Sequence, residues 1–254
     1  MYDLQRANMW KRISAGLFDF ILICILSVGI AALLSFVLKY DGYYDTLNER
    51  YAAVGEELNL DFFIDDEDYF ALSEEEQLRY NEGLKALYED DQFVIANYMI
   101  FNLSFIIVIF STLIAFLLLE FLVPMLFKNG QTLGKKIFGV AVMRIDGVKI
   151  SGPILFTRTV LGKYTVETML PIIFVLMVIF NVTNVLSALI AIGAIFLTHI
   201  IMMIVSKNNA GIHDIIANTV TVDYASQLIF DSPEALLEYK KNIHAEEVEH
   251  SQYK

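Results

Sequence analysis

Three ionisable residues stand inside long apolar runs of the chain: Asp19 in the first run, Glu120 late in the second and His199 late in the last. A charged group at membrane depth costs roughly 2.5–3.5 kcal/mol, so such residues are candidates for ion or proton binding. At the helical rise per residue, each would lie about 10 Å inside the same membrane edge. Burial can raise the pKa of a carboxyl group toward neutrality, which suits proton exchange. The sequence therefore predicts ion or proton sites at Asp19, Glu120 and His199.

Each of these residues also has a structural interpretation. Arg12 precedes Asp19 by seven residues, which is two helical turns, so the two side chains share one helix face and could form an ion pair. Arg12 alone would be an interface anchor. Glu120 would be interfacial if its span ended at Pro124, and His199 would be a hydrogen-bonded packing residue. For Asp19, a transport site and a structural ion pair both remain open.

Other chemistries have weaker signals. The four histidines show no metal-ligand spacing, and the acidic run at residues 61–68 departs from the EF-hand pattern. Gly134-Lys135-Lys136 lacks the Ser or Thr of a phosphate loop. His213-Asp214 has no motif nucleophile beside it. We therefore expect no enzyme activity, no metal and no cofactor.

The composition indicates which elements must hold these residues. Hydrophobic residues are 56% of the chain and charged residues 19%, against about 45–50% and 25% in soluble domains. Four apolar runs, at residues 13–38, 93–127, 166–180 and 185–205, are long enough to cross a bilayer or nearly so. Asn181 and Asn184 predict a tight hairpin between the last two, with a re-entrant segment as the alternative. The predicted fold class is an all-α transmembrane four-helix bundle.

The segments outside the apolar runs differ in the sign of their net charge. Residues 39–92 carry 17 acidic and 4 basic side chains, whereas residues 128–165 carry 7 basic and 1 acidic. The positive-inside rule places the basic loop, both termini, the segment 206–230 and the tail 231–254 in the cytoplasm, and the acidic insertion outside. The first span, in residues 1–38, is expected to be an uncleaved anchor. Lys128, Lys135, Lys136 and Lys163 would contact anionic lipid headgroups, and nucleic acid is not an expected partner.

The soluble segments contain local structural signals. Ser73 and Glu76 form a capping box that predicts a helix in the acidic insertion. Residues 139–145, the Asp146-Gly147 turn and residues 148–150 predict a β-hairpin, and residues 219–222 should pair with it. Residues 151–163 are expected to form an amphipathic helix before the third span. Ser232 and Pro233 predict a helical tail that frays toward Lys254.

Three motifs resemble the RDD family of bacterial and archaeal membrane proteins. The first runs from Arg12 to Asp19. The second is Gly130-Gln131-Thr132-Leu133-Gly134-Lys135-Lys136 followed by Gly139, and the third is Gly211-Ile212-His213-Asp214 continuing to Thr219. Arg158 resembles an arginine that is common before the third span. The similarity covers residues 12–222; Leu133 stands where proline is common, and the acidic insertion is long for the family.

The resemblance implies an ion or small-solute transporter, with cation(Na⁺)/proton antiport as its concrete form, in a bacterial plasma membrane. Asp19 would bind the cation or proton, Glu120 and His199 would assist it, and Arg12, Arg158 and Asp214 would form ion pairs or a gate. Asp214 could pair with Arg12 or with Lys135 and Lys136. Four spans are few for alternating access, so we expect a homo-oligomer. The alternative is a membrane scaffold that binds proteins through its acidic insertion and its sheet.

Overall fold

The computed structural model describes residues 4–127 and 129–252. Lys128 of the expected lipid-binding loop and the tail end at Lys254 lie outside the described residues, as do the side chains of Asp66 and His250. The chain divides into two compact units. Unit 1 comprises Met1–Val28 and Thr112–Lys254, and unit 2 comprises Gly29–Ser111.

Four helices are long and apolar enough to cross a membrane, which confirms the predicted fold class. The first is α1 (Met9–Val37) and the last is α10 (Val185–Val205). The second span combines α5 (Asp91–Phe116), the π-helix η1 (Leu117–Leu122) and α6 (Val123–Phe127). The third combines α8 (Gly152–Phe156), the π-helix η2 (Thr157–Met169) and α9 (Leu170–Ile179).

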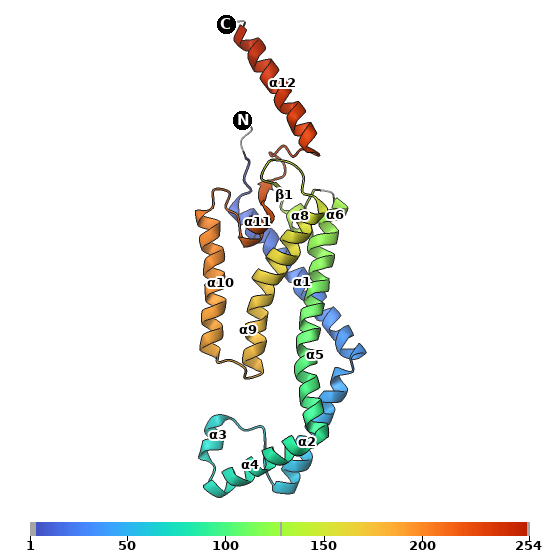
Figure 1. Cartoon of the computed structure of the whole chain (residues 1–254), viewed down its shortest axis with the longest axis vertical. Helices are drawn as coiled ribbons and strands as arrows, with labels where there is room; N and C mark the ends of the chain where they lie inside the picture. The colour runs from blue at the N-terminus through green and yellow to red at the C-terminus, as the bar shows by residue number, and fades with distance from the viewer. Residues whose placement is uncertain (1–3, 128, 253–254) are drawn as a thin grey trace. The chain divides into compact units, whose positions relative to one another are not determined.

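The third span is longer than the sequence indicated. It begins at Gly152 rather than near residue 166, so the expected amphipathic helix is its first part and not a separate surface helix. Pro153 lies in the first turn, where its missing N–H costs nothing. The helix ends before Asn181, which has a φ of 54°, and the chain returns through a short turn into α10. Figure 1 shows α9 and α10 side by side, as the predicted hairpin requires.

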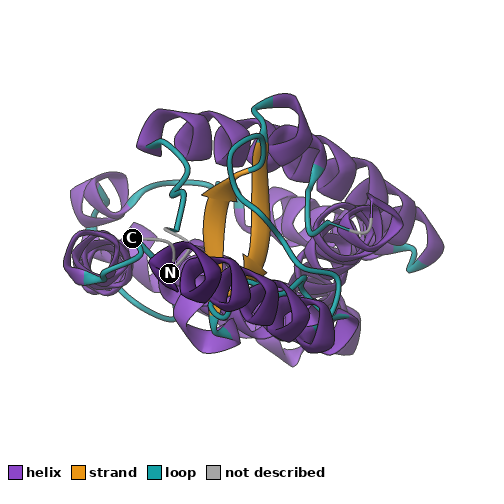
Figure 2. Ribbon diagram, turned by 90° about the horizontal axis from the view of Figure 1, so that it is seen from above, coloured by secondary structure: helices purple, strands orange, loops and turns teal. Residues whose placement is uncertain are grey.

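A two-stranded antiparallel sheet joins distant parts of unit 1. Strand β1 (Val140–Arg144) pairs with β2 (Thr219–Asp223), with Val142 opposite Thr221 (Figure 2). The expected partner at residues 148–150 forms only isolated bridges, one of them between Met143 and Lys149. The Asp146-Gly147 turn does form, but its return strand is short because α8 begins at Gly152. Residues Thr219 to Val222 supply the full strand instead.

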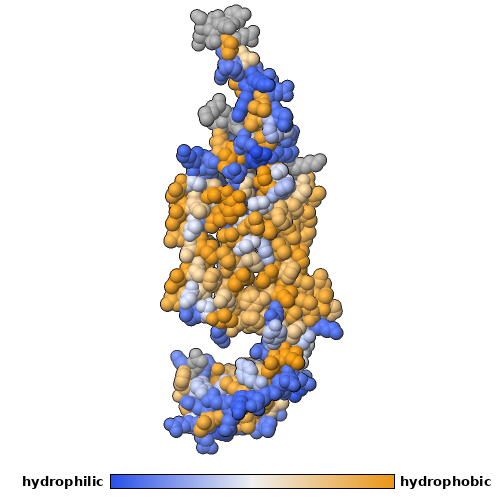
Figure 3. Space-filling view, in the orientation of Figure 1, coloured by the Kyte–Doolittle hydropathy of each residue, from blue (hydrophilic) through white to orange (hydrophobic). Residues whose placement is uncertain are grey.

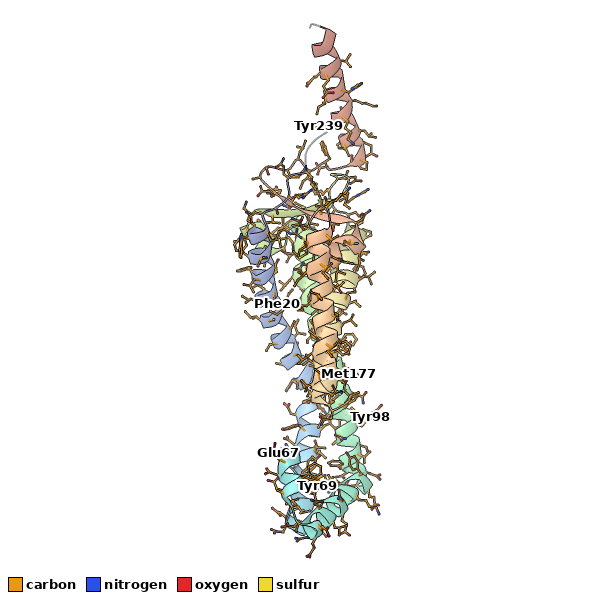
Figure 4. All side chains as sticks on the ribbon, turned by 90° about the vertical axis from the view of Figure 1, so that its left-hand side faces the viewer. Phe20, Glu67, Tyr69, Tyr98, Met177 and Tyr239 are labelled. Carbon is orange, nitrogen blue, oxygen red and sulfur yellow. The ribbon has the colours of Figure 1, made fainter. Side chains whose placement is uncertain are left out.

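Short helices surround the sheet. α7 (Leu133–Ile137) precedes β1, and α11 (Ile212–Ala217) precedes β2. α12 (Pro233–Gln252) forms the predicted tail helix, and Tyr239 on it packs against Phe230 with ring centroids 5.1 Å apart (Figure 4). Residue Arg6 bridges to Val222, so the start of the described chain meets this sheet.

Unit 2 contains the acidic insertion between parts of α1 and α5. It is helical, with α2 (Tyr40–Leu58), α3 (Asp66–Ala71) and α4 (Glu74–Glu89). The capping box of Ser73 and Glu76 is present. The rings of Tyr51, Phe62 and Phe93 pack together in its core.

The surface chemistry of unit 1 follows its helices. On the face seen in Figure 3, apolar side chains cover the spans, whereas polar side chains gather at the end of unit 1 from which α12 extends. Phe20 of α1 is 58% exposed and Phe196 of α10 is 65% exposed. Such faces fit contact with lipid chains.

Candidate functional site

The π-helix η2 places three charged residues on one face. Arg158, Lys163 and Glu167 are separated by five and four residues, a spacing that would spread the first two around an α-helix. Wider i→i+5 turns bring them into line, and the hydroxyl of Thr168 donates to the carbonyl of Lys163 in this pattern. Turns of π-helix within α-helices are frequent at functional sites.

The first group of charges, here called the lysine cluster, contains Asp19, Glu120, Lys135 and Lys163. Lys163 Nζ donates to Glu120 Oε1 at 2.6 Å. Lys135 Nζ lies 3.7 Å from Asp19 Oδ2 and 3.7 Å from Glu120 Oε2, so it bridges two spans. Glu120 belongs to η1, and its backbone carbonyl accepts a hydrogen bond from Thr159 of η2 at 2.9 Å.

The short helix α7 holds Asp19 firmly. Thr132 caps α7 and donates its hydroxyl to Asp19 Oδ2, while the N–H of Gly134 donates to Oδ1 at 2.8 Å. A Cβ on Gly134 would lie 2.4 Å from the carbonyl oxygen of Ala15, so only glycine lets α7 approach α1 this closely. Asp19 is 5% exposed and has hydrogen bonds on both oxygens.

The second group, the arginine cluster, contains Arg12, Arg158 and Asp214. Asp214 is fully buried, and its Oδ1 accepts from Arg158 Nε at 3.0 Å. Arg12 donates to Asp214 Oδ2 at 3.5 Å and to the carbonyl of Asn209 at 2.7 Å. Strand β2 completes the cluster, since Thr219 Oγ1 donates to Asp214 Oδ1 at 2.9 Å.

The third group, the histidine cluster, contains Glu167, His199 and His213. Glu167 Oε1 lies 2.8 Å from His213 Nδ1 and 3.2 Å from His199 Nδ1. The other nitrogen of His213 lies 3.5 Å from Asp214 Oδ2, so this ring connects two carboxylates. Gly162 of η2 permits the arrangement, because a Cβ there would lie 2.6 Å from the Cα of His213.

Two cavities meet at the histidine cluster. The polar cavity, of about 300 Å³, is lined by charged side chains from all three clusters, namely Arg12, Lys135, Arg158, Lys163, Glu167, His199 and His213. The apolar cavity, of about 660 Å³, lies among α1, the second and third spans and α10 and includes Phe20, Phe116, Ile172 and Phe196. Glu167 and His199 line both.

Three titratable groups next to the sheet have shifted pKa values. Burial opposes ionisation of Asp214, but Arg158, His213 and Arg12 outweigh it and hold the pKa of this carboxyl well below its usual range. Burial lowers the pKa of His213, with Asp214 and Glu167 opposing the shift. Burial likewise lowers the pKa of Lys135 to about 8, against the attraction of Glu120.

The structure places the three predicted ionisable residues in two different clusters. Asp19 and Glu120 lie on either side of Lys135, whereas His199 lies beside Glu167. The possible ion pair between Arg12 and Asp19 is absent from the described contacts, because Arg12 turns to Asp214 and Asp19 to α7. Asp214 lies against the arginines and not against Lys135 or Lys136.

The remaining motif residues shape the turns on either side of α7. Gly130 and Gly139 have φ values of 68° and 66°, which favour glycine. Gln131 Nε2 donates to the carbonyl of Val140 at 2.8 Å. Arg158 lies inside the third span and not before it, because that helix begins earlier than expected.

Sequence reasoning missed Glu167 and the pairing of Lys163. Glu167 lies at the start of the expected third span, but the sequence prediction of ion or proton sites does not include it. The same rule that selected Asp19 would have selected it. Lys163 was treated only as a lipid contact, because its partner Glu120 is far away in the sequence.

Four apolar spans enclosing buried ion pairs define a multispanning membrane protein. The RDD family model matches residues 6–218, and the chain belongs to the RDD family. A search of curated proteins found no match, and a search of solved structures found none either.

Proposed function

We propose that this protein transports an ion or a small solute and couples the movement to protons at the histidine cluster. The observation that carries the proposal is that Glu167 and His199 line both cavities. A titratable pair in this position can take a proton from one cavity and release it to the other. Buried ionisable groups within membrane spans are commonly proton relays.

His213 would control the proton. With one proton on Nδ1, the ring donates to Glu167; with a second proton the ring is cationic, and Nε2, 3.5 Å from Asp214 Oδ2, also forms an ion pair. Protonation and loss of the proton would therefore change the contact between η2 and α11. Asp214 stays ionised beside Arg158, so it serves as a fixed charge for this switch.

Cation(Na⁺)/proton antiport is one form of this activity. Sodium would replace the proton on Glu167, and the hydroxyls of Ser27 and Thr168 line the apolar cavity beside that carboxylate. Oxygen ligands suit a hard cation of this kind. Asp19 is the less suitable carboxylate, since α7 engages both of its oxygens.

Proteoliposomes with a trapped pH dye test the proposal. Sodium, lithium or potassium is added outside to wild type, to Glu167→Gln and to Glu234→Gln, a control on the tail helix α12. We expect a pH response in wild type and in the control, and its loss in Glu167→Gln. No response to any cation or to an imposed pH gradient in folded wild type would overturn proton coupling.

We further propose the membrane arrangement that the basic residues indicate. The sheet and both terminal segments of the chain would face the cytoplasm of a bacterial cell, and the acidic insertion would face outside. The apolar faces of α1 and α10 would contact lipid or a second copy in a homo-oligomer. Lys136 would contact anionic headgroups.

A scaffold remains the second candidate, favoured by one observation in unit 2. Phe63 and Phe70 are 72% and 76% exposed on a strongly acidic unit, so both rings are available to contact a partner protein. A scaffold needs no proton site. It predicts that wild type and Glu167→Gln are equally silent in the dye assay.

A further inference from the structure

The polar cavity presents positive charge to its interior. Arg12, Lys135, Arg158 and Lys163 line it, together with the carboxylate of Glu167. Among the described residues, the carboxylates that pair with these cations do not line the cavity: Asp19, Glu120 and Asp214 lie behind them. A cavity with such walls attracts anions.

The cationic side chains are held in place before any ligand arrives. Arg158 is 2% exposed and Lys135 is 7% exposed, and both are anchored to carboxylates. Arg12 is fixed by the carbonyl of Asn209. Arginine has five donors, so a guanidinium that binds one carboxylate retains donors for a second oxyanion. Preorganised donors of this kind reduce the cost of binding.

The charges around the cavity sum to zero only while Glu167 is ionised and both histidines are neutral. Four cations, Arg12, Lys135, Arg158 and Lys163, then face four carboxylates, Asp19, Glu120, Glu167 and Asp214. Glu167 is faced by His199 from α10 and by His213 from α11, with Asp214 and Arg12 next to these rings. One proton added to this group leaves one uncompensated positive charge. A monovalent anion restores neutrality.

We propose that the polar cavity binds a small oxyanion, either a carboxylate or a phosphate group, together with one proton. The volume of about 300 Å³ exceeds the share of several water molecules and accommodates such a group. The role of this oxyanion as a transported substrate rests on the proposed transport function. Its binding to the polar cavity does not depend on that function. The oxyanion comes either from a free solute or from a lipid headgroup.

Binding is measured on the purified full chain in detergent by thermal unfolding. The probes are sodium acetate, sodium phosphate and phosphatidylglycerol micelles, with sodium chloride at equal ionic strength as the reference, each at pH 5.5 and pH 7.5. We expect a saturable rise in Tm with acetate or phosphate, larger at pH 5.5. A rise with phosphatidylglycerol alone would assign the oxyanion site to a headgroup. No saturable effect of any oxyanion beyond chloride would overturn the proposal.

Two variants locate the site. Arg12→Gln should weaken apparent binding roughly tenfold or more, as expected when one charge-assisted hydrogen bond is lost. Lys11→Gln is the matched control, because Lys11 pairs with Asp223 and does not line the described cavity.

Gly16→Val is the second variant. Gly16 lines the polar cavity, so a larger side chain there narrows the cavity without removing a charge. A Cβ at Gly16 meets nothing within 4 Å, so the added side chain has room in the fold. This variant tests the site even if Arg12→Gln does not fold. Equal binding in Gly16→Val, Lys11→Gln and wild type would overturn the proposal.

Transport is measured separately from binding, so that a failure of the oxyanion proposal can be distinguished from a failure of the transport proposal. Oxyanion binding without proton flux would support the site and contradict the transporter. Proton flux driven by a pH gradient but unaffected by acetate or phosphate, with no binding, would support the transporter and contradict the oxyanion site.

Discussion

Asp19 accepts hydrogen bonds from the Thr132 hydroxyl and the Gly134 N–H, and Lys135 lies 3.7 Å from it. At the scale of single residues, this carboxylate ties α1 to α7. Glu167 is different, because it faces two histidines and two cavities. The residues that hold the fold and those that would move a proton are therefore neighbours but not the same groups.

The first prediction concerns Asp19→Asn. The variant loses a charged acceptor in a buried site, so its free energy of unfolding should fall by about 1.5–3 kcal/mol. Thermal unfolding in detergent measures the change, with Asp68→Asn on exposed α3 as the control. Full stability combined with lost transport would show that Asp19 is a transport site and not a tie between helices.

The second prediction concerns pH and His213. Burial lowers the pKa of His213 in the folded protein, so the unfolded chain binds this proton more readily. Stability should therefore fall as the pH drops below about 6.5, the ordinary pKa of histidine, and should recover above it. Melting of wild type and His213→Gln between pH 5.5 and 7.5 measures this, and the variant should lose less stability on acidification. An equal loss in both proteins would contradict this assignment.

At the scale of elements, the π-helices η1 and η2 bring the charges together. η1 contributes Glu120, and η2 contributes Arg158, Lys163 and Glu167. α11 packs against η2 at Gly162, which places His213 beside Glu167. The wider turns of η2 and Gly162 act together, because the loss of either one would move Glu167 away from His213.

The third prediction tests this packing. A Cβ at residue 162 would lie 2.6 Å from the backbone of His213, so Gly162→Ala should destabilise the protein by about 1–3 kcal/mol and weaken proton coupling. Gly193→Ala in α10 is the matched control, because a Cβ there meets nothing within 4 Å. Thermal unfolding of both variants decides the matter. Equal stability of the two would show that α11 adjusts freely.

The elements and the pairing of the two strands are largely predictable from the sequence, whereas the pairing of the buried charges is not. Apolar runs identify the spans, and the Ser73–Glu76 capping box identifies α4, because both signals are local. The pairing of the strand at residues 140–144 with residues 219–223 agrees with the sequence prediction, since both segments are rich in β-formers. The pairing of Lys163 with Glu120 depends on a contact between distant segments, which periodicity does not encode. The π-turns of η2 also leave no local signal, so the alignment of Glu167 with Arg158 was not foreseen.

At the scale of the whole molecule, the residues of the proposed transport site belong to one of the two units. Unit 1 contains all three charged clusters and both of their cavities, and unit 2 contains the acidic helices. The family match at residues 6–218 includes the residues of every cluster. The long acidic insertion is a feature of this chain that the family motifs do not require.

The fourth prediction concerns orientation. Single cysteines replace Glu67 of α3 and Glu238 of α12, both exposed, in a Cys24→Ser background. The positive-inside rule predicts that a membrane-impermeant maleimide labels position 67 in intact cells and position 238 only after lysis. The reverse pattern would place the basic sheet outside and contradict the proposed arrangement.

The most direct measurement is proton flux through proteoliposomes across an imposed pH gradient, with potassium and valinomycin clamping the voltage. Wild type, Glu167→Gln and Glu234→Gln are compared after each is shown to be folded and equally incorporated. The account predicts flux in wild type and Glu234→Gln, and a loss of roughly tenfold or more in Glu167→Gln, because the buried proton carrier is gone. Equal flux in Glu167→Gln and wild type would contradict the assignment of the proton site to the histidine cluster.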